Sequence, residues 1–150
     1  FWLGSSLMLA PLAAWIAIRG TIALETPLVL GLAVLFWVSG FDILYACQDH
    51  DFDVRAKLHS VPARFGIRNS LRIALACHLM MLVALLSLYF VSPHLGMIYL
   101  LGLLLIALLV GYQHWLVRPD DLSRVNRAFF QVNGVISVGL LVIVAIDLWV

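Results

Sequence analysis

Long apolar runs separated by short polar breaks divide the chain into five segments. A bilayer core about 30 Å thick needs roughly 20 apolar residues in a helix. Unpaired backbone groups are costly in lipid, so each segment is expected to be a helix and not an open strand. The segments cover about residues 1–18, 27–49, 70–90, 96–117 and 122–149. The pattern therefore predicts an all-α integral membrane bundle of about five transmembrane helices.

Residues that start and stop helices support these boundaries. Pro11 interrupts the first segment, and Pro27 suits the first turn of the second. Asn69 and Ser70 are good N-caps for the third. Residues 60–66 carry a Ser, a Pro in the first turn and a final Gly, which predicts a short extra helix at the membrane surface.

Composition points the same way. The 150 residues are 64% hydrophobic and 11% charged, against about 45–50% and about 25% in soluble domains. So much apolar surface cannot be buried inside a small sphere, so lipid is an expected partner. The chain opens at Phe1 within an apolar run, and we expect residues 1–150 to be the C-terminal portion of one transmembrane domain. Cys47 and Cys77 form no CxxC pair, which indicates packing roles.

The basic residues predict how the helices cross the membrane. Only Arg19 follows the first segment, whereas the other eight flank two later breaks: Arg55, Lys57, Arg64, Arg68, Arg72, Arg118, Arg124 and Arg127. Cytoplasmic loops are rich in Lys and Arg. We therefore expect residues 49–69 to be cytoplasmic and the protein to lie in a plasma membrane, the inner membrane of a bacterium. The tryptophans suit membrane interfaces and packing and do not form a stacking platform for bases, so no nucleic-acid partner is expected. The sequence does not indicate an oligomeric state.

Acidic residues mark the end of the second segment. Asp42, Tyr45, Asp49 and Asp53 are three or four positions apart, which places them on one face of a continuous helix. Asp42 lies at or inside the interface, where an ionisable group is expensive without a partner. The C-terminal end of a helix disfavours each anion by about 0.3–1 kcal/mol. A positive partner is therefore expected nearby.

Three interpretations of this acidic stripe are open. Asp51 with Arg55 and Asp53 with Lys57 could form exposed pairs worth about 0.3–0.5 kcal/mol each, as in a solvated helix end. Such pairs leave the rest of the stripe without a partner. A Mg²⁺ ion would bind several carboxylates and bridge them to a substrate diphosphate. An ion or proton pathway is the third interpretation.

Residues 42–53 and 59–66 resemble the UbiA prenyltransferase family, most nearly its 4-hydroxybenzoate polyprenyltransferase group. The first stretch has the form D-x-x-Y-A-x-x-D-x-x-x-D and is followed by a basic loop that ends in Phe-Gly. Residues 120–133 also resemble this group. The resemblance implies the last five of nine transmembrane helices, that is, the C-terminal half of the fold. The family's other acidic motif, N-x-x-x-D-x-x-x-D, is absent, so we expect the chain alone to be inactive.

The resemblance also implies roles for particular residues. Asp49 and Asp53 match the family's metal-binding pair for Mg²⁺, with Asp51 as a helper, and Asp42 and Tyr45 match catalytic positions deeper in the helix. Candidates for binding the diphosphate are Arg55, Lys57, His59 and Arg64, although the bias toward basic cytoplasmic loops would also place them here. Candidates for the acceptor side of the cavity are Asn126, Phe130 and Asn133, although intramembrane amides also join helices.

The implied reaction is Mg²⁺-dependent transfer of a polyprenyl group from its diphosphate to an aromatic acid. We expect 4-hydroxybenzoate, on the route to ubiquinone, with a dihydroxynaphthoate of a menaquinone route as the alternative. A transporter segment is the rival from another class, although it would favour broken helices and paired repeats, which the sequence does not show. His78, His94 and His114 have no ligand spacing, and we expect them to be isolated.

Overall fold

The computed structural model describes residues 2–150. Phe1, the first residue of the first predicted helix, lies outside the described residues. Those residues form helices and contain no strand, apart from an isolated bridge between Arg118 and Asp121. The elements are α1 (Trp2–Leu7), α2 (Leu9–Arg19), α3 (Glu25–Ala46), a 3₁₀ turn (Cys47–Asp49), α4 (His50–Arg55), α5 (Val61–Val91), α6 (Met97–Leu116), a π-helix (Arg127–Val132) and α7 (Asn133–Trp149). The all-α prediction is confirmed.

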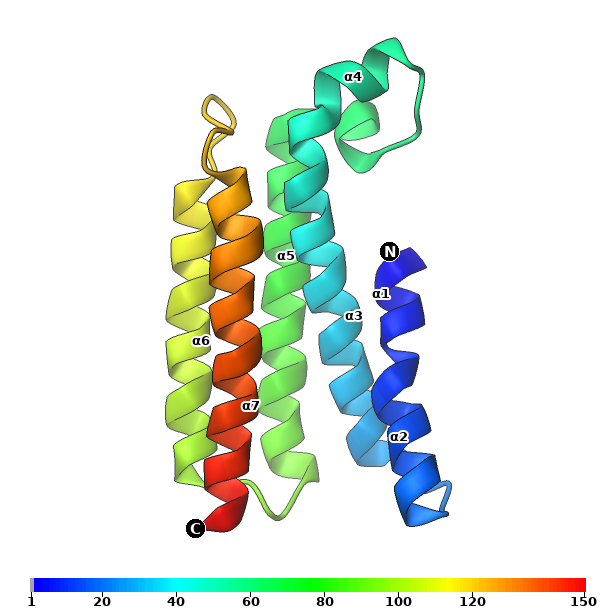
Figure 1. The fold of residues 1–150 in the computed structure, drawn as a ribbon, viewed down its shortest axis with the longest axis vertical. Helices are drawn as coiled ribbons and strands as arrows, with labels where there is room; N and C mark the ends of the chain where they lie inside the picture. The colour runs from blue at the N-terminus through cyan, green and yellow to red at the C-terminus, as the bar shows by residue number, and fades with distance from the viewer. Residues whose placement is uncertain (1) are drawn as a thin grey trace.

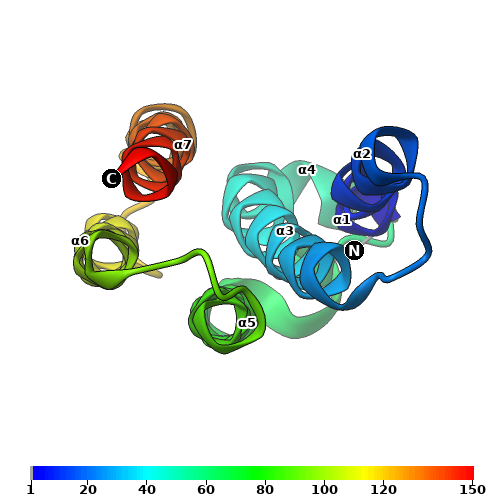
Figure 2. The same cartoon turned by 90° about the horizontal axis from the view of Figure 1, so that it is seen from below.

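Five helical stretches are long and apolar enough to cross a membrane, as predicted. They are Trp2–Arg19, Glu25–Arg55, Val61–Val91, Met97–Leu116 and Arg127–Trp149. These helices stand side by side as a tall bundle (Figure 1). Seen from its end, α3 lies between α5 and the α1–α2 pair, and α6 and α7 form a second pair beside α5 (Figure 2). The fold is therefore an integral membrane helical bundle.

The core lies where α3, α5, α6 and α7 face one another. Leu44, Ala74, Met81, Ile106 and Ile136 are almost fully buried there. Outward-facing side chains are mostly apolar and exposed, as lipid-facing residues must be. Apolar side chains thus serve both the interior and the outer surface, which explains why the helices show no clear polar face.

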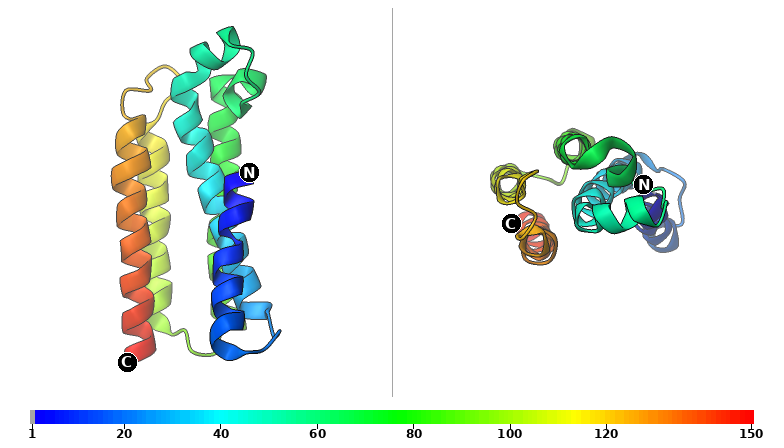
Figure 3. Two further views of the ribbon diagram at one scale, coloured as in Figure 1. Left: turned by 45° about the vertical axis from the view of Figure 1, so that its right-hand side comes forward. Right: turned by 90° about the horizontal axis from the view of Figure 1, so that it is seen from above.

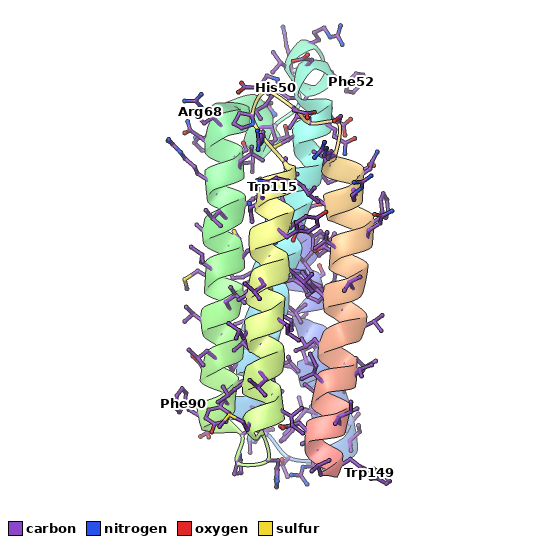
Figure 4. The ribbon with its side chains drawn as sticks, turned by 90° about the vertical axis from the view of Figure 1, so that its left-hand side faces the viewer. His50, Phe52, Arg68, Phe90, Trp115 and Trp149 are labelled. Atoms are coloured by element: carbon purple, nitrogen blue, oxygen red, sulfur yellow. The ribbon has the colours of Figure 1, made fainter. Side chains whose placement is uncertain are left out.

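Aromatic residues mark both ends of the bundle. Trp115 lies toward the end that also carries His50 and Arg68, while Phe90 and Trp149 lie near the opposite end (Figure 4). Trp115, Phe90 and Trp149 are all exposed. Aromatic side chains favour the two membrane–water interfaces, so this distribution fits helices that cross a bilayer.

The two basic loops lie at the same end of the bundle. The α3–α5 connection with α4 and the loop between α6 and the π-helix are both at the top, whereas the C-terminus and the α5–α6 turn are at the bottom (Figures 1 and 3). In Figure 3 the first span, with α2, descends to the lower end, where Arg19 lies close to the α2–α3 loop. The asymmetry of charge seen in the sequence is thus an asymmetry of the folded bundle.

The first predicted helix is divided into two. α1 ends at Leu7 and α2 begins at Leu9, with Pro11 in the first turn of α2. Pro11 has no N–H to donate to the carbonyl four positions earlier, which is that of Leu7. The break therefore falls where the helical hydrogen bond is missing.

The predicted caps of the third helix are wrong. Gly66 has φ 75° and ψ 160°, a conformation that suits glycine, and the long helix of α5 follows it directly. The side chains of Asn69 and Ser70 donate to the carbonyls of Phe65 and Gly66, at 3.1 and 2.9 Å. They donate hydrogen bonds to carbonyl oxygens at the break, and they do not accept from the N–H groups of a helix start.

The fifth helix begins at Val125, three residues later than predicted. The amide and the hydroxyl of Ser123 donate to one Asp121 oxygen, at 3.0 and 2.6 Å. These two hydrogen bonds lower the pKa of the Asp121 carboxyl, and the bond from the hydroxyl has the larger effect. Together with the bridge between Arg118 and Asp121 they hold a tight turn, which delays the helix.

Candidate functional site

The acidic stripe does not lie on one continuous helix face. α3 ends at Ala46, a 3₁₀ turn follows, and α4 turns away from the axis of α3 (Figure 1). Asp42 is half-buried on α3 and Asp49 is exposed at the turn, whereas Asp53 is only 8% exposed. The prediction of a shared face is wrong because the change of direction separates the upper carboxylates from Asp42 and Tyr45.

A cavity of about 850 Å³ lies under the α4–α5 connection. Its lining includes Asp53 together with Lys57, His59 and Arg64, three of the four basic candidates. The chain turns sharply here, since Leu58 N donates to the carbonyl of Asp53 at 2.8 Å. Lys57 has φ 55°, which is unusual for a residue with a side chain. The turn therefore brings a buried carboxylate and three basic side chains to one space.

The far wall of this cavity is the short helix predicted from residues 60–66. Ala63 N donates to the Ser60 hydroxyl at 3.2 Å, and Pro62 lies in the first turn. Gly66 ends the helix with its positive φ. The predicted cap, proline and terminating glycine are all confirmed, and Arg64 and Phe65 of this helix line the cavity.

Asp51 and Arg55 lie outside the cavity. The side chain of Asp51 is 89% exposed, and one of its oxygens is 2.9 Å from His50 Nδ1. Arg55 Nε donates to the backbone carbonyl of Asp51 at 3.1 Å and not to its carboxylate. The structure thus separates two predicted site residues from the other basic candidates, because they occupy the opposite side of α4.

Asp53 has no charged partner in the part of the chain described. Within residues 2–150 the one ion pair joins His50 and Asp51, so the two pairs of the solvated-helix interpretation do not form. A buried carboxylate is costly unless a cation or hydrogen-bond donors balance it. Carboxylate oxygens are ligands that Mg²⁺ prefers, with waters and substrate phosphates completing the shell. Asp53, with Asp49 before it, therefore fits such an ion in chemistry, although residues 2–150 contain no group of three ligating side chains.

An aromatic wall follows the upper part of α3. We use this name for Phe41 and Tyr45 of α3 with Phe129 and Phe130 of the π-helix. The ring centroids of Tyr45 and Phe129 are 4.4 Å apart, those of Phe41 and Phe129 are 5.3 Å apart, and those of Tyr45 and Phe130 are 6.3 Å apart. Phe130 remains 62% exposed. The structure thus brings Tyr45 and Phe130, predicted separately, into one surface.

Amide side chains border the aromatic wall. Gln48 Nε2 donates to Asn126 Oδ1 at 3.2 Å, which joins the end of α3 to the start of the fifth span. Asn133 lies deeper and is only 9% exposed. Its Oδ1 accepts from Trp37 Nε1 and from Gln113 Nε2, both at 3.3 Å. Asn133 therefore makes the interhelical hydrogen bonds that were the alternative to a cavity role.

Sequence reasoning missed Phe129, Gln113 and a histidine pair. His78 Nδ1 and His114 Nε2 are 2.8 Å apart, and the rings meet edge to face. The prediction that these histidines are isolated is wrong, because α5 and α6 bring together residues 36 positions apart. Two residues so far apart in the sequence share no short motif from which their contact could be predicted. The exposed His94 keeps no such partner.

The sequence was compared with known protein families and proteins. A model of the UbiA prenyltransferase family matches residues 1–135. The 4-hydroxybenzoate octaprenyltransferase of Tolumonas auensis is 34% identical over 135 residues, which cover 90% of this chain and 45% of the relative. That of Xanthomonas euvesicatoria is 34% identical over 139 residues, covering 88% and 44%. The mitochondrial 4-hydroxybenzoate polyprenyltransferase of Arabidopsis thaliana is 35% identical over 75 residues, covering 47% and 18%.

No solved structure matches the chain. The chain spans less than half the length of the curated relatives that it matches most fully. The family match nevertheless covers the acidic motif, the cavity, the aromatic wall and the first part of the fifth span. The chain belongs to the UbiA prenyltransferase family.

Proposed function

We propose that this chain forms part of a membrane prenyltransferase that moves a polyprenyl group from its diphosphate to an aromatic acid in quinone biosynthesis. The observation that carries the proposal is the cavity in which buried Asp53 faces Lys57, His59 and Arg64. Basic side chains suit a diphosphate, and the carboxylate suits the metal that accompanies it. The family match and the names of the relatives support the same chemistry.

The residues of the cavity would act on the leaving diphosphate. Lys57 and Arg64 would bind its oxygens and stabilise the negative charge that grows as the carbon–oxygen bond breaks. His59 would add a hydrogen-bond donor. Asp49 and Asp53 are the residues that would hold Mg²⁺, and the bound ion would supply further neutralisation of the diphosphate. Asp42 and Tyr45 would act deeper, next to the reacting carbon.

The aromatic wall would serve the organic part of the reaction. Ionisation of an allylic diphosphate leaves a carbocation, which water would destroy. The rings of Tyr45, Phe129 and Phe130 present apolar faces that exclude water and attract positive charge. An aromatic acceptor can stack on the same wall, with Gln48 and Asn126 as hydrogen-bonding groups at its edge.

We propose 4-hydroxybenzoate as the acceptor, because relatives that are 34% identical to this chain over the aligned residues bear its name. A dihydroxynaphthoate of a menaquinone route is the alternative. The basic loops at one end of the bundle favour a cytoplasmic cavity in a bacterial inner membrane.

The test is prenyl transfer in membranes that contain the longest natural form of the protein carrying residues 1–150. The assay supplies labelled prenyl diphosphate, either acceptor, and Mg²⁺ or EDTA. We expect prenylated 4-hydroxybenzoate with Mg²⁺, and almost none with EDTA or in Asp49→Ala. Product from the dihydroxynaphthoate alone would change the acceptor. A folded, inserted protein that forms no product with either acceptor would overturn the proposal, and ion flux in proteoliposomes would then favour the transport interpretation.

A further inference from the structure

A buried amide network connects three membrane-spanning helices at the level of the π-helix. Gln113 of α6 is fully buried, and its Nε2 donates to Ala128 O and to Asn133 Oδ1, both at 3.3 Å. Asn133 Oδ1 also accepts from Trp37 Nε1 of α3 at 3.3 Å. A buried amide is costly without partners, so these bonds hold the three helices in one register.

The network meets the fifth span where its helix is irregular. Residues Arg127–Val132 form a π-helix, whose carbonyls are displaced from ordinary α-helical pairing. Ala128 O belongs to this stretch and receives the Gln113 amide. Ala128 is itself fully buried, so no solvent can replace that donor. Gln113 therefore stabilises the irregular turn from a neighbouring helix.

The same π-helix carries half of the aromatic wall. Phe129 follows Ala128 directly, and its ring lies 4.4 Å from that of Tyr45 and 4.7 Å from that of Phe130. The extra residue per turn of a π-helix changes the direction of every side chain that follows it. The position of both phenylalanines thus depends on keeping this irregular turn.

We infer that Gln113 is a positioning residue for the acceptor side of the site: it holds the π-helix so that Phe129 and Phe130 face Tyr45. The inference rests on the proposed function, because it assigns the aromatic wall to the aromatic acceptor. Gln113 lies beneath the wall and does not line the cavity of Lys57, His59 and Arg64. Its loss should therefore affect the acceptor and leave the diphosphate end largely intact.

The test compares Gln113→Leu with wild type in the membrane assay, with KM measured separately for acceptor and prenyl diphosphate. Leucine has similar volume and suits a membrane helix, but it cannot donate to Ala128 O. We expect kcat/KM for the acceptor to fall on the order of 10- to 100-fold, as for a misplaced reacting group. The KM for prenyl diphosphate should stay close to that of wild type.

Gln131→Leu is the matched control, because Gln131 is an exposed glutamine on the same π-helix whose side chain makes no hydrogen bond within residues 2–150. It should retain wild-type kinetics. Asn133→Leu should reproduce the Gln113→Leu defect, and the double variant should be no worse than the poorer single variant, since both changes break one network. In Gln113→Glu, the carboxyl group can donate to Ala128 O only when it is protonated. Lowering the pH should therefore restore part of the acceptor kcat/KM of this variant.

Each other outcome has a definite meaning. Unchanged acceptor kinetics in a folded Gln113→Leu protein would overturn the inference, as would an equal loss in Gln131→Leu. A parallel rise in both KM values would show a general structural role and would also overturn it. If Gln113→Leu does not fold, Gln113→Glu and Asn133→Gln are compared singly and in combination. Additive losses of acceptor kcat/KM in the double variant would then overturn the inference. A wild-type protein without transfer activity would count against the proposed function and not against the network.

Discussion

At the scale of single residues, position on α4 decides which carboxylate is buried and which is exposed. Asp53 is buried in the cavity, whereas Asp51 points outward and is engaged by His50. The two residues are both aspartates and lie two positions apart in the sequence. Their different surroundings imply different consequences when each charge is removed.

Asp53→Asn should lower prenyl transfer on the order of 100-fold, because a neutral amide is a weaker ligand than a carboxylate for the Mg²⁺ that would accompany the diphosphate. Asp51→Asn should cost clearly less, since that side chain lies outside the cavity. Steady-state assays in membranes at several Mg²⁺ concentrations measure both effects. Asp120→Asn, in the other loop at this end, is the control. Equal losses for Asp51 and Asp53 would contradict the geometry.

Gly40 gives a second prediction at this scale. A Cβ placed there would lie 2.5 Å from atoms of the His78 ring, so α3 and α5 approach closely at this point. Gly40→Ala should therefore lower the free energy of unfolding by about 1–3 kcal/mol through overpacking. Thermal unfolding in detergent measures the change.

Gly139→Ala is the matched control for Gly40→Ala, because nothing lies within 4 Å of a Cβ at Gly139. The added variant His78→Ala should relieve part of the Gly40→Ala defect, since it removes the ring that the methyl group meets. Equal shifts for the two glycine variants would show that the close approach is not the cause.

At the scale of elements, neighbouring helices complete each other's ends. Gly96 N donates to Asp147 Oδ2 at 2.6 Å, and Tyr99 N donates to Asp147 Oδ1 at 3.1 Å. Asp147 lies near the C-terminal end of α7, where the helix dipole disfavours an anion, and at the N-terminal end of α6, where it favours one. The neighbouring helix thus explains an acid within an otherwise apolar segment.

Asp147→Leu should destabilise the bundle by about 1–2 kcal/mol, because the first turn of α6 loses its cap. Asp147→Asn should cost less, since its amide oxygen still accepts one hydrogen bond. Hydrogen exchange of the Gly96 and Tyr99 amides, with thermal unfolding in detergent, measures the effect. Asp120→Leu, at an exposed position, is the control. Unchanged exchange in Asp147→Leu would contradict the capping role.

At the scale of the whole molecule, the bundle has one basic end and one end with few charges. The α4–α5 connection, whose residues line the cavity, lies at the same end as both basic loops and the π-helix, while the turn between α5 and α6 lies at the opposite end (Figures 1 and 3). The Lys and Arg excess of cytoplasmic loops therefore predicts that the site faces the cytoplasm.

Single cysteines at Asp120 and at His94 test this orientation, in a background without Cys47 and Cys77. A maleimide that cannot cross membranes should label His94→Cys in intact cells, and Asp120→Cys only after permeabilisation. Both native positions are exposed, so burial does not bias the comparison. The reverse pattern of labelling would place the site outside.

Features that depend on residues close together in the chain could be predicted from the sequence. Apolar run length predicted five helices, and the Ser60 cap with Gly66 predicted the short helix, because these effects act within a few positions. Which side of α4 carries the cavity and which rings face Tyr45 depend instead on how the helices pack. The tertiary structure also joined Gln48 to Asn126 and Trp37 to Asn133, 78 and 96 residues apart. Such contacts depend on how each helix is rotated and packed in the bundle. A helix in lipid is apolar on all sides, so its sequence has no polar face from which this rotation could be predicted.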